Sequence, residues 1–291
     1  MSTDPGRSET RRLSRRALLA ALPLTLVAGC AQSPTGRSTP PVAVSTLLAD
    51  QPFYVAHRGG GGDWPEMTLY AYEQASRVPG LISMEVSVCL SADGVLVCSH
   101  DLTTKRTTGV SHVIAQTMWS TLATLQVSAK DTTNPRQPGR PLARFDDVLE
   151  RYRDSHVLFV EPKSGLAVAP LMAALRAARA ERVVWKQPIN SLAFAPAKQQ
   201  GFATWGYVLD EPAHLGSNLV RYAASHDVDL LGAPLSEDDA FIRRVVRAAK
   251  ANGKQSVGWA IRSTADLRRA EGLGITGMMT SNPAELLGPP R

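Results

Sequence analysis

Short apolar segments alternate with helical patterns along most of the chain. From residue 53 onward there are eight such segments, each bounded by turn residues as a buried β-strand would be. Eight strands separated by helices over about 235 residues predict a (β/α)8 TIM barrel in one domain, with a small insertion after the second strand. A doubly wound open sheet is the alternative. The predicted strands are 53–56, 81–88, 157–160, 183–185, 202–208, 229–233, 256–261 and 275–279, and the clearest predicted helices are 68–78, 168–180, 238–251 and 263–272.

The first thirty residues have the composition of an export signal. A charged region with Arg11, Arg12, Arg15 and Arg16 precedes a 12-residue apolar run over 17–28, which is too short to span a bilayer. The segment around Arg15-Arg16 resembles a twin-arginine signal, and Val27–Cys30 resembles a lipobox that would direct acylation of Cys30. An amphipathic helix with an unrelated cysteine is the alternative.

These features predict an exported protein, lipid-anchored on the extracytoplasmic face of the cell membrane. The expected organisation is a signal peptide over 1–29, lipidated Cys30 with a flexible tether over 30–50, and the barrel over 51–291.

Charge and cysteine content narrow the class of function. The net charge is +6, but residues 1–29 hold five Arg and two acidic residues, which leaves +3 for the remainder. No stripe of Lys and Arg with interleaved aromatics occurs, which argues against a nucleic-acid partner. Three Cys are too few for a disulfide scaffold or a multi-cysteine zinc module. After the leader no apolar run reaches about 18 residues, so no internal transmembrane helix is predicted.

Polar side chains stand at the ends of several predicted strands, where a barrel places its active site. Two carboxylates on neighbouring strands suit a hard divalent cation, and Arg and Lys beside them suit a phosphate. Two histidines suit acid and base catalysis near neutral pH. Together these groups predict metal-assisted hydrolysis of a phosphodiester, although each residue alone has an ordinary structural interpretation. They are His57-Arg58, Glu85 with Ser87, His100-Asp101 after the Asp93-Gly94 turn, Glu161-Pro162-Lys163, and Trp259.

An ordered set of motifs resembles the glycerophosphodiester phosphodiesterase family. His57-Arg58-Gly59 and Pro65-Glu66-Met67-Thr68 are similar to the HRG and PENT elements that open the family pattern, and the resemblance extends over roughly residues 53–287. The later motifs are Glu85-Val86-Ser87, Asp93-Gly94 with His100-Asp101, Arg106–Gly109, Pro141-Leu142 with Val148-Leu149, Glu161-Pro162-Lys163, Trp259 and Thr280–Pro283.

The resemblance implies a barrel enzyme that uses a divalent cation, Ca²⁺ or Mg²⁺, and cleaves glycerophosphodiesters to an alcohol and glycerol 3-phosphate. By motif, His57 and His100 would be the acid/base pair, and Arg58 and Lys163 would hold the phosphate. Trp259 would form a wall of the substrate pocket, and an insertion over about 107–141 would cap its mouth. The implied metal ligands are Glu85, Glu161, Glu66 and position 87.

Three positions depart from the family pattern. Ser87 replaces the second carboxylate of Glu-x-Asp, Met67 replaces Asn, and Ser281 replaces Asp. Ser87 takes the ligand set from three negative charges to two, which leaves open weaker metal binding, another metal, no metal, or replacement by Asp63 or Glu66. The presence of both histidines with Arg58 and Lys163 favours a modified enzyme over an inactive one.

Two other functions remain open. One is a non-catalytic lipoprotein that binds a phosphoglycan or lipid head group, for which Ser87 and Met67 argue. The other is a phospholipase D-like lipid phosphodiesterase. The leading interpretation is hydrolysis of a glycerophosphodiester or a glycerol-phosphate polymer by a protein that reaches the membrane through its lipid anchor.

Cys89 and Cys98 flank the predicted hairpin and, by parity, are expected on the strand face of Glu85 and Ser87. A two-residue turn would set the cysteines opposite each other, where a disulfide is possible in an oxidising compartment. A three-residue loop would shift the pairing by one and make them diagonal neighbours. Two buried free thiols are the remaining alternative.

Overall fold

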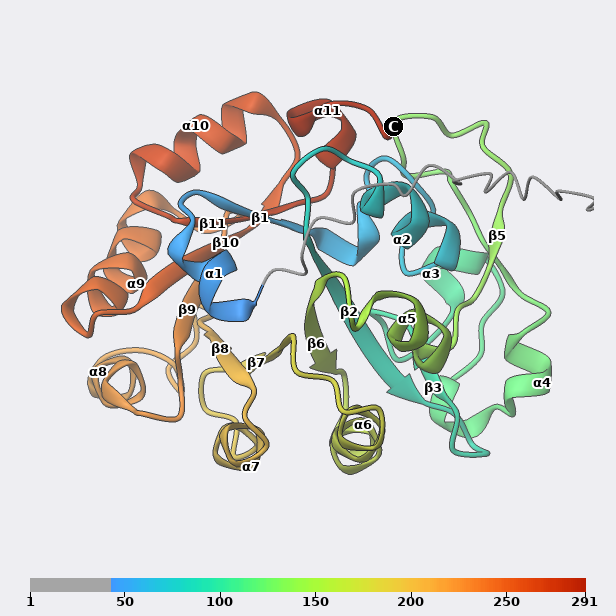
Figure 1. Ribbon diagram of the computed structural model, residues 1–291, viewed down its shortest axis with the longest axis horizontal. Coiled ribbons are helices and arrows are strands. Elements are labelled where there is room, and N and C mark those ends of the chain that lie inside the picture. The colour runs from blue at the N-terminus through green and yellow to red at the C-terminus, as the bar shows by residue number, and fades with distance from the viewer. Residues whose placement is uncertain (1–42) are drawn as a thin grey trace, which may run out of the picture. The chain divides into compact units, whose positions relative to one another are not determined.

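Eight parallel strands close into a barrel in the computed structural model, which describes residues 43–291 (Figure 1). These residues lie within one compact unit, Pro40–Arg291. The predicted signal peptide, Cys30 and the tether up to residue 42 lie outside the described residues. The barrel confirms the predicted fold, and the open sheet is wrong because β11 pairs with β1 and β1 pairs with β2. The barrel strands are β1 Phe53–Ala56, β2 Ser83–Leu90, β6 Val157–Pro162, β7 Val183–Pro188, β8 Ala203–Tyr207, β9 Leu230–Pro234, β10 Gln255–Ile261 and β11 Gly277–Thr280.

Helices connect the strands and cover the outside of the barrel, and Figure 1 shows α6, α7 and α8 following one another around it. Each predicted strand and each of the four clearest predicted helices is present. Residues 43–291 contain no helix with the length and apolar character to cross a membrane. The helices that follow barrel strands are α2 Leu69–Ser76, α6 Gly165–Ala177, α7 Phe194–Gln199, α8 Ser217–Ala224, α9 Asp239–Ala251, α10 Thr264–Gly272 and α11 Pro283–Leu287.

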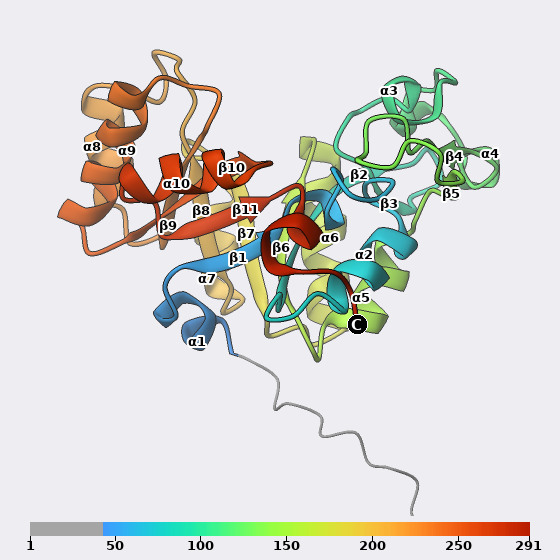
Figure 2. The same ribbon diagram turned by 90° about the horizontal axis from the view of Figure 1, so that it is seen from above.

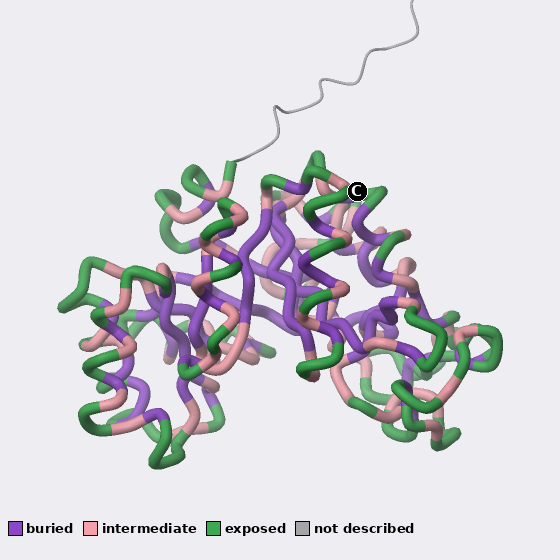
Figure 3. The backbone as a smooth tube through the Cα atoms, turned by 90° about the horizontal axis from the view of Figure 1, so that it is seen from below, coloured by how far each residue is buried: buried purple, intermediate pink, exposed green. Residues whose placement is uncertain are grey.

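Alternation along the strands separates two apolar layers. Outward residues pack under the helices, and inward residues such as Val55, Phe159, Val184 and Trp205 fill the barrel interior. Figure 3 shows the buried strands running through the centre of the molecule, with exposed segments outside them. The inward positions nearer the carboxyl ends of several strands are polar, and there the candidate site lies.

The folded unit begins earlier than the predicted boundary at residue 51. Residues Val44–Ala49, expected in the tether, form helix α1. Leu47 is 3% exposed and packs with Phe53 and Val55 in the interior cluster. Burial of one leucine side chain is worth about 1.5–3 kcal/mol, which explains why this segment is held against the barrel.

The insertion after β2 forms a small subdomain beside that strand, as Figure 2 shows. It has its own apolar cluster, which includes Ile114, Leu122 and Val127. Its Thr133 N–H donates to the Gly62 carbonyl over 2.7 Å, so the insertion lies against the loop after β1. Its elements are β3 Leu96–Cys98, α3 Lys105–Thr108, α4 Trp119–Leu122, β4 Gln126–Val127 and β5 Arg140–Pro141, and α5 Phe145–Tyr152 follows.

The β2–β3 hairpin decides the state of the two described cysteines. Ser91 and Val95 close a three-residue loop whose last residue, Gly94, has φ +81°. The register therefore pairs Cys89 with Val97 and sets Cys98 opposite Val88. The prediction that the cysteines share a face is wrong, and so is the possible disulfide. Both are buried free thiols, and burial raises the pKa of Cys89 to about 12, which makes it unreactive.

Candidate active site

The loop after β1 brings His57 under the end of β11. The Gly62 N–H donates to the Ser281 carbonyl over 2.8 Å, and a Cβ at Gly62 would lie 2.4 Å from the Asn282 side chain, so only glycine permits this approach. As a result the Ser281 hydroxyl lies 2.8 Å from His57 Nδ1. His57 is 6% exposed, and burial lowers its pKa to about 3, so the imidazole is neutral.

His100 is held by a carboxylate instead of a hydroxyl. Its Nδ1 lies 2.8 Å from Asp101 Oδ1, and Arg106 Nε donates to Asp101 Oδ2 over 2.6 Å. Arg106 also pairs with Glu66 over 2.5 Å, and Glu66 pairs with Arg58 over 3.2 Å. We call Arg58, Glu66, Asp101 and Arg106 the outer cluster. Burial disfavours ionisation of Glu66, but the two guanidinium groups outweigh it and lower the pKa of Glu66.

A second set of ion pairs lies deeper in the barrel, on the inward faces of β2, β6 and β7. Lys186 Nζ donates to Oε1 of Glu85 and, over 2.8 Å, to Oε2 of Glu161. Lys163 Nζ donates to Oε1 of Glu161 over 2.9 Å. We call Glu85, Glu161, Lys163 and Lys186 the inner cluster. Burial opposes ionisation of both carboxyl groups, but the adjacent ammonium groups hold both pKa values below the ordinary range.

Further donors complete the inner cluster. The Arg58 backbone N–H donates to Oε2 of Glu85 over 2.9 Å, from a turn in which Arg58 has φ 54°. Ser87 donates to Oε2 of Glu161 over 3.2 Å, and the Tyr207 hydroxyl donates to Oε1 of Glu161 over 3.2 Å. Burial, together with the Glu161 carboxylate, raises the pKa of Tyr207, so it stays a neutral donor.

These residues do not fit the predicted divalent-cation site. Within residues 43–291, no three His, Cys, Asp or Glu side chains gather as metal ligands would. Glu85, Ser87 and Glu161 do meet, as predicted, but an ammonium group lies between the two carboxylates. Glu66, predicted as a further ligand, is engaged by two arginines.

Asp63, a possible substitute ligand, and Met67, which replaces the Asn of the family pattern, both have structural roles. Asp63, considered as a substitute ligand, accepts from the Ala284 N–H over 2.8 Å at the start of α11 and from the Asn282 amide over 3.1 Å. Met67 is buried, and its sulfur accepts from the Tyr72 hydroxyl over 3.0 Å. Neither residue therefore offers a ligand to the inner cluster.

Two adjoining cavities open beside His57 and Arg58. One, of about 310 Å³, is walled by Trp259 and Leu235. The other, of about 150 Å³, is lined by Glu66, Arg106 and Ser281, together with Asp131 of the insertion. Arg262 borders both cavities. The half-buried Trp259 therefore lines a cavity beside His57, and three arginines, Arg58, Arg106 and Arg262, lie around the mouth.

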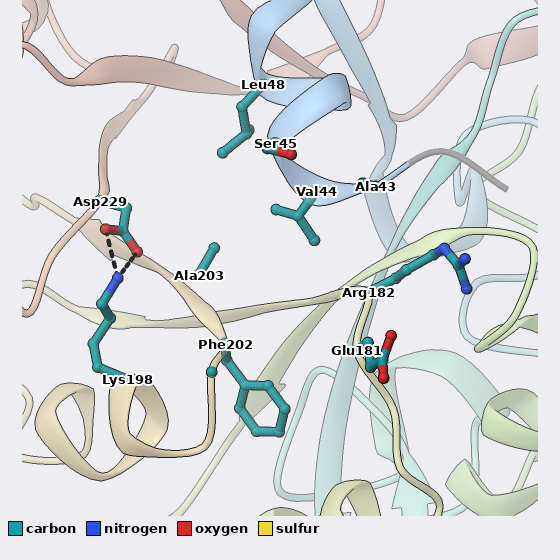
Figure 4. Close-up of a pocket in the computed structure, with 11 residues that line it drawn as sticks. Ala43, Val44, Ser45, Leu48, Glu181, Arg182, Lys198, Phe202, Ala203 and Asp229 are labelled. Atoms are coloured by element: carbon teal, nitrogen blue, oxygen red, sulfur yellow. Dashed lines mark hydrogen bonds and ion pairs between the residues drawn. The ribbon is translucent and has the colours of Figure 1, made fainter.

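A larger cavity, of about 520 Å³, lies away from these residues, beside α1 and the residues that precede β7 and β8 (Figure 4). An ion pair between Lys198 and Asp229, 2.8 Å long, spans one side of it. The cavity is therefore at the amino-terminal ends of the strands, opposite the end that carries the candidate site.

Lys186 and Tyr207 are the principal site residues that sequence reasoning missed. Lys186 directly follows the predicted strand 183–185 and has the parity of Val184, which was a usable signal. Parity does not reveal which face of a strand turns inward, however. Arg106 enters the sequence prediction only through the Arg106–Gly109 motif, and Arg262 lies in none of the motifs.

The fold and geometry define a (β/α)8 barrel with a charged, histidine-bearing site at the carboxyl ends of its strands. Residues 57–184 match the model of the Glycerophosphoryl diester phosphodiesterase family. A Glycerophosphodiester phosphodiesterase of Caldanaerobacter subterraneus is 25% identical over 244 residues, which cover 80% of this chain and 95% of that protein. One of Arabidopsis thaliana is 39% identical over 89 residues, but these are 30% of this chain and 24% of that protein.

Solved structures share the fold. A phosphodiesterase of Oleispira antarctica, in complex with the product sn-glycerol-3-phosphate, matches with a TM-score of 0.62 and 22% identity over 83% of this chain and 96% of that one. A putative glycerophosphoryl diester phosphodiesterase of Agrobacterium tumefaciens matches with a TM-score of 0.66 and 20% identity, over 79% and 94% of the two chains.

Proposed function

We propose that the chain is a phosphodiester hydrolase that cleaves glycerophosphodiesters to an alcohol and glycerol 3-phosphate. The observation that carries the proposal is the meeting of two histidines with arginine and lysine side chains at one barrel end, inside the segment that matches the family model. His57 and Arg58 border both cavities, and the outer cluster links Arg58 to His100 through successive ion pairs.

Arg58 and Lys163 would hold the non-bridging oxygens of the phosphate, because their charges and N–H donors suit an anion. His100 would take a proton from the water that attacks the phosphorus and return a proton to the oxygen of the leaving alcohol as its bond to phosphorus breaks, since the Asp101 carboxylate stabilises the imidazolium that forms. His57 would act as a neutral imidazole at the reacting phosphate, because a serine hydroxyl and a buried setting give little support to a positive charge. Trp259 would contact the alcohol side of the substrate.

A non-catalytic binding function is the second candidate. Ser87 and Lys186 favour it, because both lower the negative charge that a metal-dependent hydrolase of this family is expected to offer. Such a protein would bind the same phosphodiesters through Arg58 and Lys163 and would release nothing.

The test is an assay of the purified full chain with glycerophosphocholine and glycerophosphoethanolamine. Glycerol 3-phosphate would be measured after chelator treatment and after separate addition of Ca²⁺, Mg²⁺, Mn²⁺ and Zn²⁺. We expect product that the variant H57A/H100A does not form. Saturable binding of either compound without product under all five conditions would replace the hydrolase by the binding function.

We also propose that the protein is exported and anchored through lipid on Cys30. The twin-arginine and lipobox patterns support this proposal. Cell fractionation of the wild type and Cys30→Ala should find the wild type with membranes and the variant in the soluble fraction. Equal membrane association of the two would contradict anchoring through Cys30.

A further inference from the structure

Every carboxylate oxygen of the inner cluster already has a donor. Glu85 receives Lys186 on Oε1 and the Arg58 N–H on Oε2. Glu161 receives Lys163 and Tyr207 on Oε1, and Lys186 with Ser87 on Oε2. A divalent cation between Glu85 and Glu161 would need oxygen lone pairs from both carboxylates. The Lys186 ammonium group already donates to one oxygen of each carboxylate.

The charges of the inner cluster balance without a metal ion. Two carboxylates face two ammonium groups, and the three groups of Glu85, Glu161 and Lys186 are each at most 5% exposed. A divalent cation added to this set would leave two uncompensated positive charges in a buried site, which is strongly unfavourable. Ser87 acts in the same direction from another strand, because it contributes no negative charge where the family pattern has an aspartate.

Aromatic rings make the position of Lys186 a favourable one for a monovalent cation. Its Nζ lies 5.2 Å from the ring centre of Trp205, 5.5 Å from that of Tyr207 and 5.9 Å from that of Trp259. Such rings attract a cation through their electron-rich faces and partly replace its lost hydration. Two carboxylates and three rings therefore surround the ammonium group, which explains how a lysine is kept at 4% exposure.

We propose that the Lys186 ammonium group takes the place of the divalent cation, so that the site assembles and binds phosphodiesters without a metal ion. The part that concerns catalysis rests on the proposed function: hydrolysis then needs no divalent cation. The part that concerns the protein itself does not, because it states that the wild type has no divalent-cation site and that Lys186 with Ser87 is the reason.

The test measures metal binding to the full chain, after chelator treatment, by calorimetry with Ca²⁺ and Mg²⁺ and by the electron paramagnetic resonance of Mn²⁺. The wild type should show no saturable site up to millimolar ion. The variant S87D/K186M has three carboxylates and no ammonium group between them. It should gain one saturable Mn²⁺ site whose affinity is at least about tenfold higher than any residual Mn²⁺ binding of the wild type. The matched control S87D/K198M removes the Lys198 that pairs with Asp229 at the other end of the barrel and should gain no such site.

Several results would overturn the inference. One is a saturable site in the wild type that E85Q abolishes, and another is a folded S87D/K186M that binds no ion. If that double variant does not fold, the comparison of metal binding between the wild type and E85Q tests the inference by itself. Product formation that stops with chelator and returns with Ca²⁺ would also overturn it. Absence of product under every condition would count against the proposed hydrolase, whereas the binding result would stand by itself.

Discussion

The inner and outer clusters contain the same kinds of charge in different surroundings. Each has two carboxylates and two cationic side chains. The side chains of Glu85, Glu161 and Lys186 are 0%, 3% and 5% exposed, whereas those of Asp101 and Arg106 in the outer cluster are 30% and 39% exposed. The inner residues lie on or directly after barrel strands, and the outer ones lie on loops and on α3.

The difference in solvent exposure predicts different roles for the two clusters. Water screens Asp101 and Arg106, at 30% and 39% exposed, more than it screens Glu66, at 12%, so the outer pairs add less to stability than the inner ones and can respond to an incoming phosphate. Lys186 and its two carboxylate partners are hidden from water, whereas Lys163 is 17% exposed, and loss of Lys186 leaves buried charges uncompensated. Each histidine borders one cluster: His57 Nε2 lies 3.6 Å from Glu85, and His100 bonds to Asp101.

The largest expected effect is that of Lys186→Met on the free energy of unfolding. Removal of one partner of a buried ion pair costs about 3–5 kcal/mol, because the remaining carboxylates repel each other in a low-dielectric setting. Urea unfolding followed by circular dichroism would measure it. The matched outer variant, Arg106→Met, should cost about 1 kcal/mol or less. Equal losses in the two variants would break the distinction between the clusters.

The two histidines should differ in their effect on turnover. His100→Ala should lower kcat by about 10²–10⁴-fold, the range for loss of a general acid or base. His57→Gln keeps a neutral hydrogen-bonding side chain and should cost less. Steady-state assay with glycerophosphocholine gives both values. A larger loss of kcat in His57→Gln than in His100→Ala would reverse the roles proposed for the two histidines.

The coupling energy of an ion pair should depend on salt in the outer cluster and not in the inner cluster. A double-mutant cycle on Glu66 and Arg106 should give about 1 kcal/mol or less at low ionic strength, because Arg106 is 39% exposed. The coupling should fall further at about 1 M NaCl, where the Debye length is near 3 Å. A cycle on Glu85 and Lys186 should change little with salt. A salt-sensitive inner coupling would show that water reaches those residues.

The smallest expected effect is that of Arg106→Gln on the loss of stability at acid pH. The pKa of Glu66 lies below its ordinary 4.5 because Arg106 and Arg58 outweigh the effect of burial. The stability that this ionised group provides is therefore present above pH 4.5 and is lost as pH falls through the lower folded value. Unfolding at pH 5, 4 and 3 should show a shallower decline in Arg106→Gln than in the wild type. Arg144→Gln, which breaks an exposed pair with Asp146, should leave the decline unchanged.

Prediction from sequence succeeded where the signal was local. The strand pattern gave all eight barrel strands, because an apolar run between turn residues is a property of neighbouring positions. The motifs placed His57, Arg58, Glu85, Glu161 and Trp259 at one barrel end, where the structure has them.

Prediction failed where the answer depended on distant partners. Glu66 was expected beside a metal because its charge is visible in the sequence, but its two arginine partners are not. Cys89 and Cys98 were expected on one face, and a three-residue loop moved the register by one. α1 was assigned to a tether because residues 31–46 are rich in Ser, Thr, Pro and Gly, and that composition does not show that the barrel buries Leu47.

The sequence by itself therefore determined the barrel, the order of its strands and the set of chemical groups at their ends. Only the tertiary structure decided which of these groups meet. Parallel pairing in the sheet sets β2, β6 and β7 side by side, and so places Lys186 between Glu85 and Glu161, whose positions are 101 and 25 residues away in the chain. Alternation along a strand is a short-range rule, whereas the pairing of buried charges depends on the low dielectric and fixed geometry that exist only after folding.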